Sequence, residues 1–165
     1  MESDIPEKKK ERLAQLLIRN KIRLARDALI KRYQQELGYQ LKAEQFIDFD
    51  ASLHIKQAVY HKVRDLQSQK IVEFVDFQDV LNTLNQLKQK IIRLSEEVIF
   101  YYLDKSYREG VETGGFKIRF EDFWEILGKI SNNPGSDIIA VDASLAFGIC
   151  IEPEEYSYLL TTWGL

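Results

Sequence analysis

Apolar residues in the first quarter of the chain recur at the spacing of one helix face. Over residues 8–37 they lie three or four positions apart, and Gly38 follows the last of them. Positions with this spacing form one stripe of a helix, and a glycine just beyond the stripe is a common C-terminal stop. The pattern predicts a long helix over residues 8–37 with one apolar stripe formed by Ala14, Ile18, Ile22, Ala25, Leu29, Tyr33 and Leu37.

Two more helices are predicted before residue 95. One extends from about Asp50, a plausible N-cap, to Gln69, and the other starts near Asp76 and reaches about Leu94. The apolar face of the first comprises Ile55, Val59, Val63 and Leu66, and that of the second comprises Val80, Leu84, Leu87, Ile91 and Leu94.

The pattern changes after residue 95 to short runs rich in aromatic and β-branched residues. Residues 98–103 are typical of a strand buried on both faces, although so short a run also fits the end of the preceding helix. The polar break over residues 93–97 favours the strand. Residues 116–120 alternate between apolar and polar, which predicts another strand. A helix follows over residues 120–130, because its apolar residues return to helical spacing before the stop at residues 132–135.

Three strands are predicted at the end of the chain, over residues 137–142, 146–151 and 156–163. Their connecting turns are short, so we expect an antiparallel meander. The fold class is therefore α+β: a helical N-terminal half packed on a mainly antiparallel sheet of about five strands, with one inserted helix. The length of 165 residues fits a single domain over residues 1–165.

Composition indicates an intracellular protein. No run of eighteen apolar residues occurs, and the charged first residues lack the apolar core of a secretory signal. The single cysteine, Cys150, excludes an internal disulfide. We expect a cytoplasmic location in a bacterial cell and no membrane among the partners.

Charge is divided unevenly along the chain. Residues 1–95 hold 18 Lys and Arg against 13 Asp and Glu, a net charge of +5, whereas residues 96–165 hold 5 against 13, a net charge of −8. Such asymmetry indicates that one part of the molecule presents a negative field, although two differently solvated surfaces would give the same count.

No set of residues forms a recognised catalytic pattern. His54 and His61 lie seven positions apart on a predicted helix, roughly 10 Å along its axis, which is too far to share a metal ion. Cys150 lies in an apolar strand, where an inert thiol is usual. The carboxylates show no known spacing, and no glycine-rich phosphate loop occurs. We expect no enzyme activity, no cofactor and no metal.

The basic first helix leaves nucleic acid binding as an alternative. Residues 8–32 carry ten Lys and Arg, and Arg12, Arg19, Arg23 and Arg26 fall on one flank of the apolar stripe. The domain as a whole is acidic, with a pI near 5.5, and no known nucleic-acid motif follows. We therefore expect no nucleic acid partner.

The last seventy residues resemble the immunity proteins that protect bacteria from polymorphic toxins, including those of contact-dependent growth inhibition. The likeness is carried by residues 98–109, 116–122, 137–152 and 155–163 and covers under half of the chain. The resemblance implies a protein without catalysis of its own that binds a cognate toxin domain, often a nuclease, and covers its active site.

A toxin with a basic cleft would fit the acidic half of the chain. The residues expected to contact it are Asp104, Glu109, Glu112, Glu121, Asp122, Glu152, Glu154, Glu155 and Tyr156. Glu121 and Asp122 also suit the positive end of a helix dipole, and the turn acids also suit plain solvation. A regulatory or adaptor module remains the other class of protein-binding function, and the oligomeric state stays open.

Overall fold

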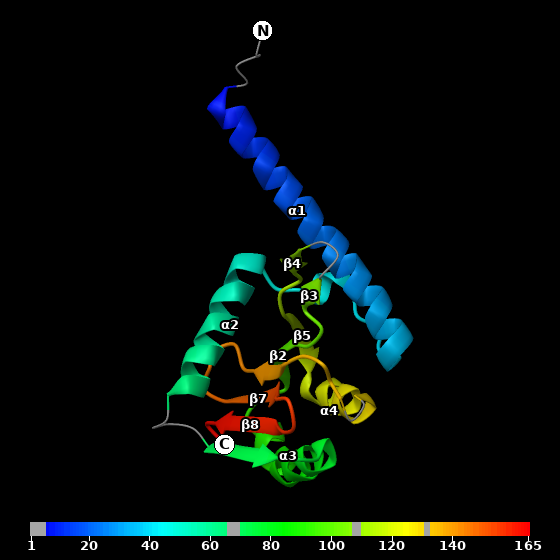
Figure 1. Ribbon diagram of the computed structural model, residues 1–165, viewed down its shortest axis with the longest axis vertical. Coiled ribbons are helices and arrows are strands. Elements are labelled where there is room, and N and C mark those ends of the chain that lie inside the picture. The colour runs from blue at the N-terminus through cyan, green and yellow to red at the C-terminus, as the bar shows by residue number, and fades with distance from the viewer. Residues whose placement is uncertain (1–5, 66–69, 107–109, 131–132) are drawn as a thin grey trace.

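A six-stranded antiparallel sheet forms the centre of the molecule (Figure 1). The computed structural model describes residues 6–65, 70–106, 110–130 and 133–165. The strand order is β1-β8-β7-β6-β2-β5, and the short strands β3 and β4 pair separately. The helices are α1 (Glu7–Arg32), α2 (Phe49–Arg64), α3 (Phe77–Ile92) and α4 (Phe120–Lys129). The strands are β1 (Lys70–Phe74), β2 (Glu97–Tyr101), β3 (Lys105–Ser106), β4 (Val111–Glu112), β5 (Phe116–Arg119), β6 (Ile138–Val141), β7 (Gly148–Pro153) and β8 (Tyr158–Trp163).

The sheet separates two hydrophobic clusters, because successive side chains of a strand point to opposite faces. In β2, Phe100 belongs to the larger cluster, which includes side chains of α3, α4 and the second half of α1. Its neighbour Tyr101 belongs to the smaller cluster, which includes Val59 and Val63 of α2. The α+β architecture with helices on both faces of an antiparallel sheet confirms the predicted fold class.

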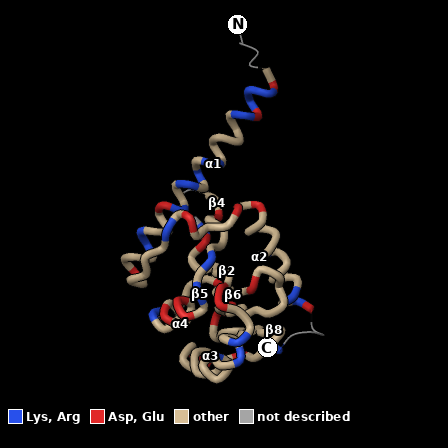
Figure 2. The backbone as a smooth tube through the Cα atoms, turned by 180° about the vertical axis from the view of Figure 1, so that it is seen from behind, with Lys and Arg blue, Asp and Glu red and all other residues tan. Residues whose placement is uncertain are grey.

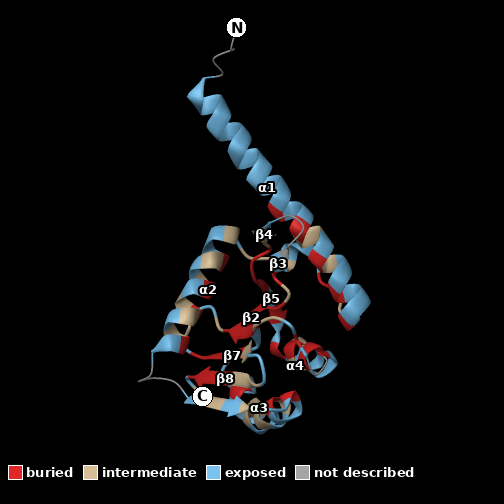
Figure 3. Cartoon of the chain, in the orientation of Figure 1, coloured by how far each residue is buried: buried red, intermediate tan, exposed pale blue. Residues whose placement is uncertain are grey.

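The first helix is continuous and ends where the sequence predicts. A single π-helical turn (Tyr33–Leu37) follows α1, and Gly38 takes the left-handed conformation (φ 59°) that closes it. The stripe is buried only from Ile22 onward, whereas Ala14 and Ile18 are exposed. These two residues of the stripe are exposed because the first turns of α1 extend away from the sheet and its covering helices (Figure 3).

The second and third helices differ from prediction mainly at their ends. The N-cap of α2 is Asp48 instead of Asp50, since its Oδ1 accepts a hydrogen bond from the Ala51 backbone N–H at 2.9 Å. This helix ends at Arg64, and the predicted continuation over residues 66–69 lies outside the described residues. The third helix begins near Asp76 as predicted, and Asp76 is its N-cap because its side chain accepts from the backbone N–H of Gln78 at 2.8 Å.

The second half of the chain follows the predicted order. Residues 98–101 form a strand and not a helix, within β2 (Glu97–Tyr101), whereas Tyr102 and Leu103 of the predicted strand lie beyond its end. Helix α4 connects β5 to β6. Strands β6, β7 and β8 form the predicted antiparallel meander. A strand that the sequence analysis did not assign, β1, pairs with β8 and completes the sheet.

Candidate functional site

The sheet register places the predicted acidic residues at two opposite ends of the sheet. Strand β2 runs from Glu97, which pairs with the last residue of β5, to Tyr101, which pairs with Ile139 near the start of β6. The turn between β7 and β8 lies at the Tyr101 end, because Pro153 pairs with Tyr158 there.

We call the group at this end the acidic end, and it comprises Asp104, Asp137, Glu152, Glu154, Glu155 and Tyr156. Glu121 and Asp122 instead begin α4, directly after β5, at the opposite end. The predicted contact residues therefore do not form one continuous surface (Figure 2 shows how the charges are distributed).

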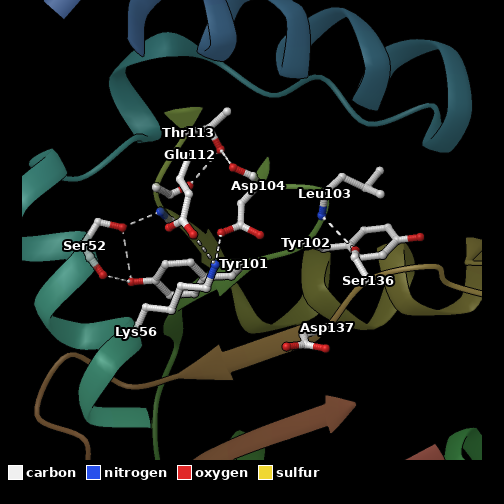
Figure 4. Close-up of polar contacts among 12 residues, drawn as sticks. Ser52, Lys56, Tyr101, Tyr102, Leu103, Asp104, Glu112, Thr113, Ser136 and Asp137 are labelled. Carbon is white, nitrogen blue, oxygen red and sulfur yellow. Dashed lines mark hydrogen bonds and ion pairs between the residues drawn. The ribbon is translucent and has the colours of Figure 1, made fainter. Parts of the chain in front are cut away.

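Asp104, which was expected to contact a partner, is instead buried inside the protein. Its Oδ2 is 2.6 Å from Nζ of Lys56 on α2, and the two side chains are 7% and 9% exposed (Figure 4). Glu112 of β4 is half-buried and lies 3.5 Å from the same ammonium. One lysine from the second helix is thus held by two carboxylates from the segment that follows β2, and the three charges connect α2 to the β3–β4 pair.

Hydrogen bonds around this ion pair fix the neighbouring backbone. The Tyr101 hydroxyl donates to the carbonyl of Ser52 at 2.8 Å, and the backbone N–H of Gly115 donates to the Ser52 hydroxyl at 2.6 Å. The Thr113 backbone N–H donates to the carbonyl of Asp104 at 2.6 Å. Burial raises the pKa of Tyr101 to about 12, so its hydroxyl remains a donor at neutral pH.

Arg26 of α1 also has a structural role here. Its Nε donates to the carbonyl of Thr113 at 2.8 Å and its Nη2 to the carbonyl of Ile47 at 3.0 Å. The guanidinium also lies over the ring of Phe46, 4.7 Å from the ring centroid. Arg26 is therefore not available for a phosphate backbone, as the nucleic acid alternative required.

A cavity of about 300 Å³ opens beside the Lys56–Asp104 pair. It is lined by side chains of α1 and α2, by the segment after β2 and by residues 134–137. At its edge the hydroxyl of Tyr60 donates a short hydrogen bond to Asp137. Burial raises the pKa of Tyr60 well above its usual value, and the hydrogen bond to Asp137 raises it further. Leu103 adopts a positive φ of 60°, an uncommon conformation for a residue with a side chain.

The rest of the acidic end carries carboxylates without ion-pair partners among the residues that the structure describes. Glu152 is half-buried, and its pKa is raised first by burial and then by the nearby charges of Asp137 and Glu154. Glu154 and Glu155 are exposed, and Tyr156 beside them is 81% exposed. A negative charge excess and an exposed aromatic side chain, which is hydrogen-bonded to Glu155, therefore lie together on the turn after β7.

The remaining predicted contact residues lie elsewhere. Glu121 is exposed, 3.9 Å from Arg119, and the half-buried Asp122 accepts from Arg119 at 3.1 Å. Both lie in the first turn of α4, which confirms their predicted position there. Glu109 lies outside the described residues.

The histidines and the cysteine that the sequence offers as reactive groups lie apart in the described structure. His54 and His61 are both exposed on α2. Cys150 is buried, and burial raises the pKa of its thiol well above the usual value, as expected for an inert core cysteine. Over residues 6–65, 70–106, 110–130 and 133–165, no three His, Cys, Asp or Glu side chains gather into a metal-binding group. None of the described helices is both long and apolar enough to cross a membrane.

Sequence reasoning missed Lys56 and Ser52. A signal was present, because Ser52, Lys56 and Val59 share the helical spacing of the buried face of α2. A lysine on such a stripe needs a buried carboxylate, but the sequence did not indicate which of its many acids would be the partner.

The fold and the site define a small α+β domain. A buried ion pair joins its helix α2 to the segment that follows β2, and the acidic turn between β7 and β8 lies at the same end of the sheet. The chain belongs to the YxiF protein family, whose family model matches residues 29–163. The match begins inside α1, so the exposed first turns of that helix precede it. No curated protein and no solved structure matches this chain.

Proposed function

We propose that this chain is a protein-binding inhibitor, and that in a bacterial cytoplasm it acts as an immunity protein that covers the active site of a cognate toxin domain. The observation that carries the proposal is the acidic end: Glu154, Glu155 and Tyr156 are exposed side by side on one turn. The resemblance of the C-terminal half to polymorphic-toxin immunity proteins supports the same class.

The unbalanced charge of this turn favours a basic partner. Burial raises the pKa of Glu152, and the nearby charges of Asp137 and Glu154 raise it further. A Lys or Arg side chain of a partner, placed among them, would remove this repulsion and gain charge-assisted hydrogen bonds. Opposite charges also steer association, with rate constants up to about 10⁸ M⁻¹s⁻¹ at low salt. A nuclease domain, with a basic cleft for its substrate, is the toxin class that this surface suits best.

Tyr156 supplies an aromatic anchor for such an interface. When a partner binds, an exposed tyrosine buries a large area at a low cost in side-chain entropy. Tyrosine is also enriched among the residues that dominate binding energy. The backbone of the turn is already fixed, since the Glu154 N–H donates to the carbonyl of Ser157 at 2.8 Å and the Ser157 hydroxyl donates to Glu73 of β1 at 2.7 Å. A fixed turn loses little freedom on binding, which favours affinity.

The proposal predicts that a toxin domain is encoded next to this chain, and that domain provides the test. Mixing the purified partners should give a one-to-one complex by light scattering and should abolish the toxin's catalytic activity at equimolar ratio. A regulatory adaptor would bind its partner without blocking catalysis. Full toxin activity in the presence of excess chain would refute the inhibitor proposal.

A further inference from the structure

The first half of α1 contains no buried residue, although Gln15, Ile18 and Arg19 line one side of an open pocket of about 740 Å³ that Asp48, Phe49 and Asp50 line from the other side. Residues 6–21 are all exposed, and the helix extends away from the sheet and its covering helices (Figures 1 and 3). Five large apolar side chains of α1 are nonetheless 40–56% exposed: Leu13, Leu16, Leu17, Ile18 and Leu24. Ile18 lies on the side of the helix that carries Ile22, Ala25 and Leu29, and the other four are leucines.

These leucines share one face of the helix. With 3.6 residues per turn, they fall within an arc of about 100°. The side chains through which α1 joins the core, Ile22, Ala25 and Leu29, are centred roughly on the opposite side of the helix. A flat surface could therefore contact the leucine face along its length while the rest of the domain lies behind the helix.

Basic side chains border the leucine face on both sides. By helical position, Arg12, Arg19 and Arg23 lie along one border, and Lys10 and Lys21 lie along the other. All five are exposed, and only Arg23 has an ion-pair partner in the described structure, Asp27 at 3.4 Å. The occupant of this face must therefore be both apolar and negatively charged.

We propose that the leucine face of α1 binds the surface of an anionic phospholipid membrane. An interfacial helix of this kind inserts leucines between lipid tails and headgroups, while Lys and Arg at its borders contact the anionic headgroups. A second copy of this chain is a poor occupant, because pairing two leucine faces would bring basic borders together. Nucleic acid would use the basic borders and leave the leucines in water.

This mode of contact needs neither a spanning helix nor a secretory signal, so the sequence features that argue against a membrane partner do not oppose it. The leucine face also precedes the family match at residues 29–163 and shares no residue with the acidic end. The inference is therefore independent of the proposed function.

The test is flotation of the full chain with vesicles of phosphatidylcholine, with and without phosphatidylglycerol. The chain should float with the anionic vesicles and not with the neutral ones. The paired change Leu16→Ser and Leu17→Ser should lower the partition coefficient at least about tenfold, because each buried methylene contributes to insertion. Neutralising Arg19 and Lys21 to Gln should lower it about fivefold for each charge removed.

Matched controls exist outside α1. Ile92→Ser with Leu94→Ser removes two exposed apolar side chains, and Lys42→Gln with Lys70→Gln removes two exposed charges. Both control pairs should float like the unchanged chain, as should a variant of Glu154 and Glu155. Because the substituted leucines are exposed, near-ultraviolet circular dichroism should show the native signal in every variant.

Three results would overturn the proposal. The first is no flotation, or equal flotation with neutral vesicles. The second is flotation that the α1 variants and the controls lose equally. The third is binding of another occupant to this face. That occupant would be a second copy, if the chain forms a leucine-dependent dimer without lipid. It would be nucleic acid, if the chain is retained on duplex DNA or RNA and retention requires Arg19 and Lys21 but not the leucines.

Discussion

The ammonium of Lys56 lies 2.6 Å from a carboxylate oxygen of Asp104, and both side chains are buried. The lysine belongs to α2 and the aspartate follows β2, so the pair spans two segments that lie 48 positions apart in the chain. Asp104 is thereby committed to the fold, and the exposed acids of the same sheet end remain free to contact a partner.

Removing one member of this pair should destabilise the protein strongly. Lys56→Met leaves the buried carboxylate of Asp104 without its cation, and we expect a loss of about 3–5 kcal/mol in the free energy of unfolding. Urea denaturation followed by circular dichroism measures it. The double variant Lys56→Met with Asp104→Leu should recover part of the loss. A single variant within about 0.5 kcal/mol of the unchanged protein would show that the pair contributes nothing to the fold.

Glycine at position 148 is required by close packing. A Cβ added there would collide with the indole ring of Trp163, which is buried in the facing strand β8. Gly148→Ala should cost about 1–3 kcal/mol, because the ring has no room to move without disturbing the core. Gly128→Ala is the matched control: it meets no atom within 4 Å in α4 and should stabilise the protein by about 0.5–1 kcal/mol. Thermal melts of both variants test the opposite signs.

Glu152 should make the folded state less stable when it is ionised. Burial and the charges of Asp137 and Glu154 raise its pKa in the folded protein. A carboxyl with a raised folded pKa destabilises the fold above that pKa, and the effect disappears below the unfolded value near 4.3. Glu152→Gln should therefore melt at a higher temperature than the unchanged protein at pH 7.5. The difference should vanish at about pH 3. A variant that melts lower at pH 7.5 would contradict the assigned repulsion.

Local sequence signals predicted most of the elements correctly. Gly38 stops the first helix and Asp76 caps the third, because a left-handed glycine and a capping carboxylate act through the nearest backbone groups. The meander of three strands followed from short turns. Strand β1 was missed because it lies between two helices and its pattern is half polar; only pairing with β8 makes it a strand.

The candidate site was less accessible to sequence reasoning. The exposure of Glu154 and Glu155 agrees with their predicted position on a turn, which depends on neighbours in the chain. Tyr156 lies within the predicted strand 156–163, but β8 starts two residues later and leaves Tyr156 on the turn. The burial of Asp104 and the separation of Glu121 from the acidic end depend on strand order and register. Those are set by contacts between distant segments, and a single sequence shows no sign of them.

If this chain inhibits a toxin through the acidic end, the growth of cells that produce that toxin measures the inhibition most directly. Cells that express the neighbouring toxin domain should grow with the unchanged chain and stop growing with Glu154→Lys and Glu155→Lys. The pair Glu96→Lys and Glu121→Lys makes the same charge change on exposed residues at the other end of the sheet, and cells carrying it should grow. Full protection by the Glu154 and Glu155 variant, or loss of protection only in the Glu96 and Glu121 variant, would contradict the account.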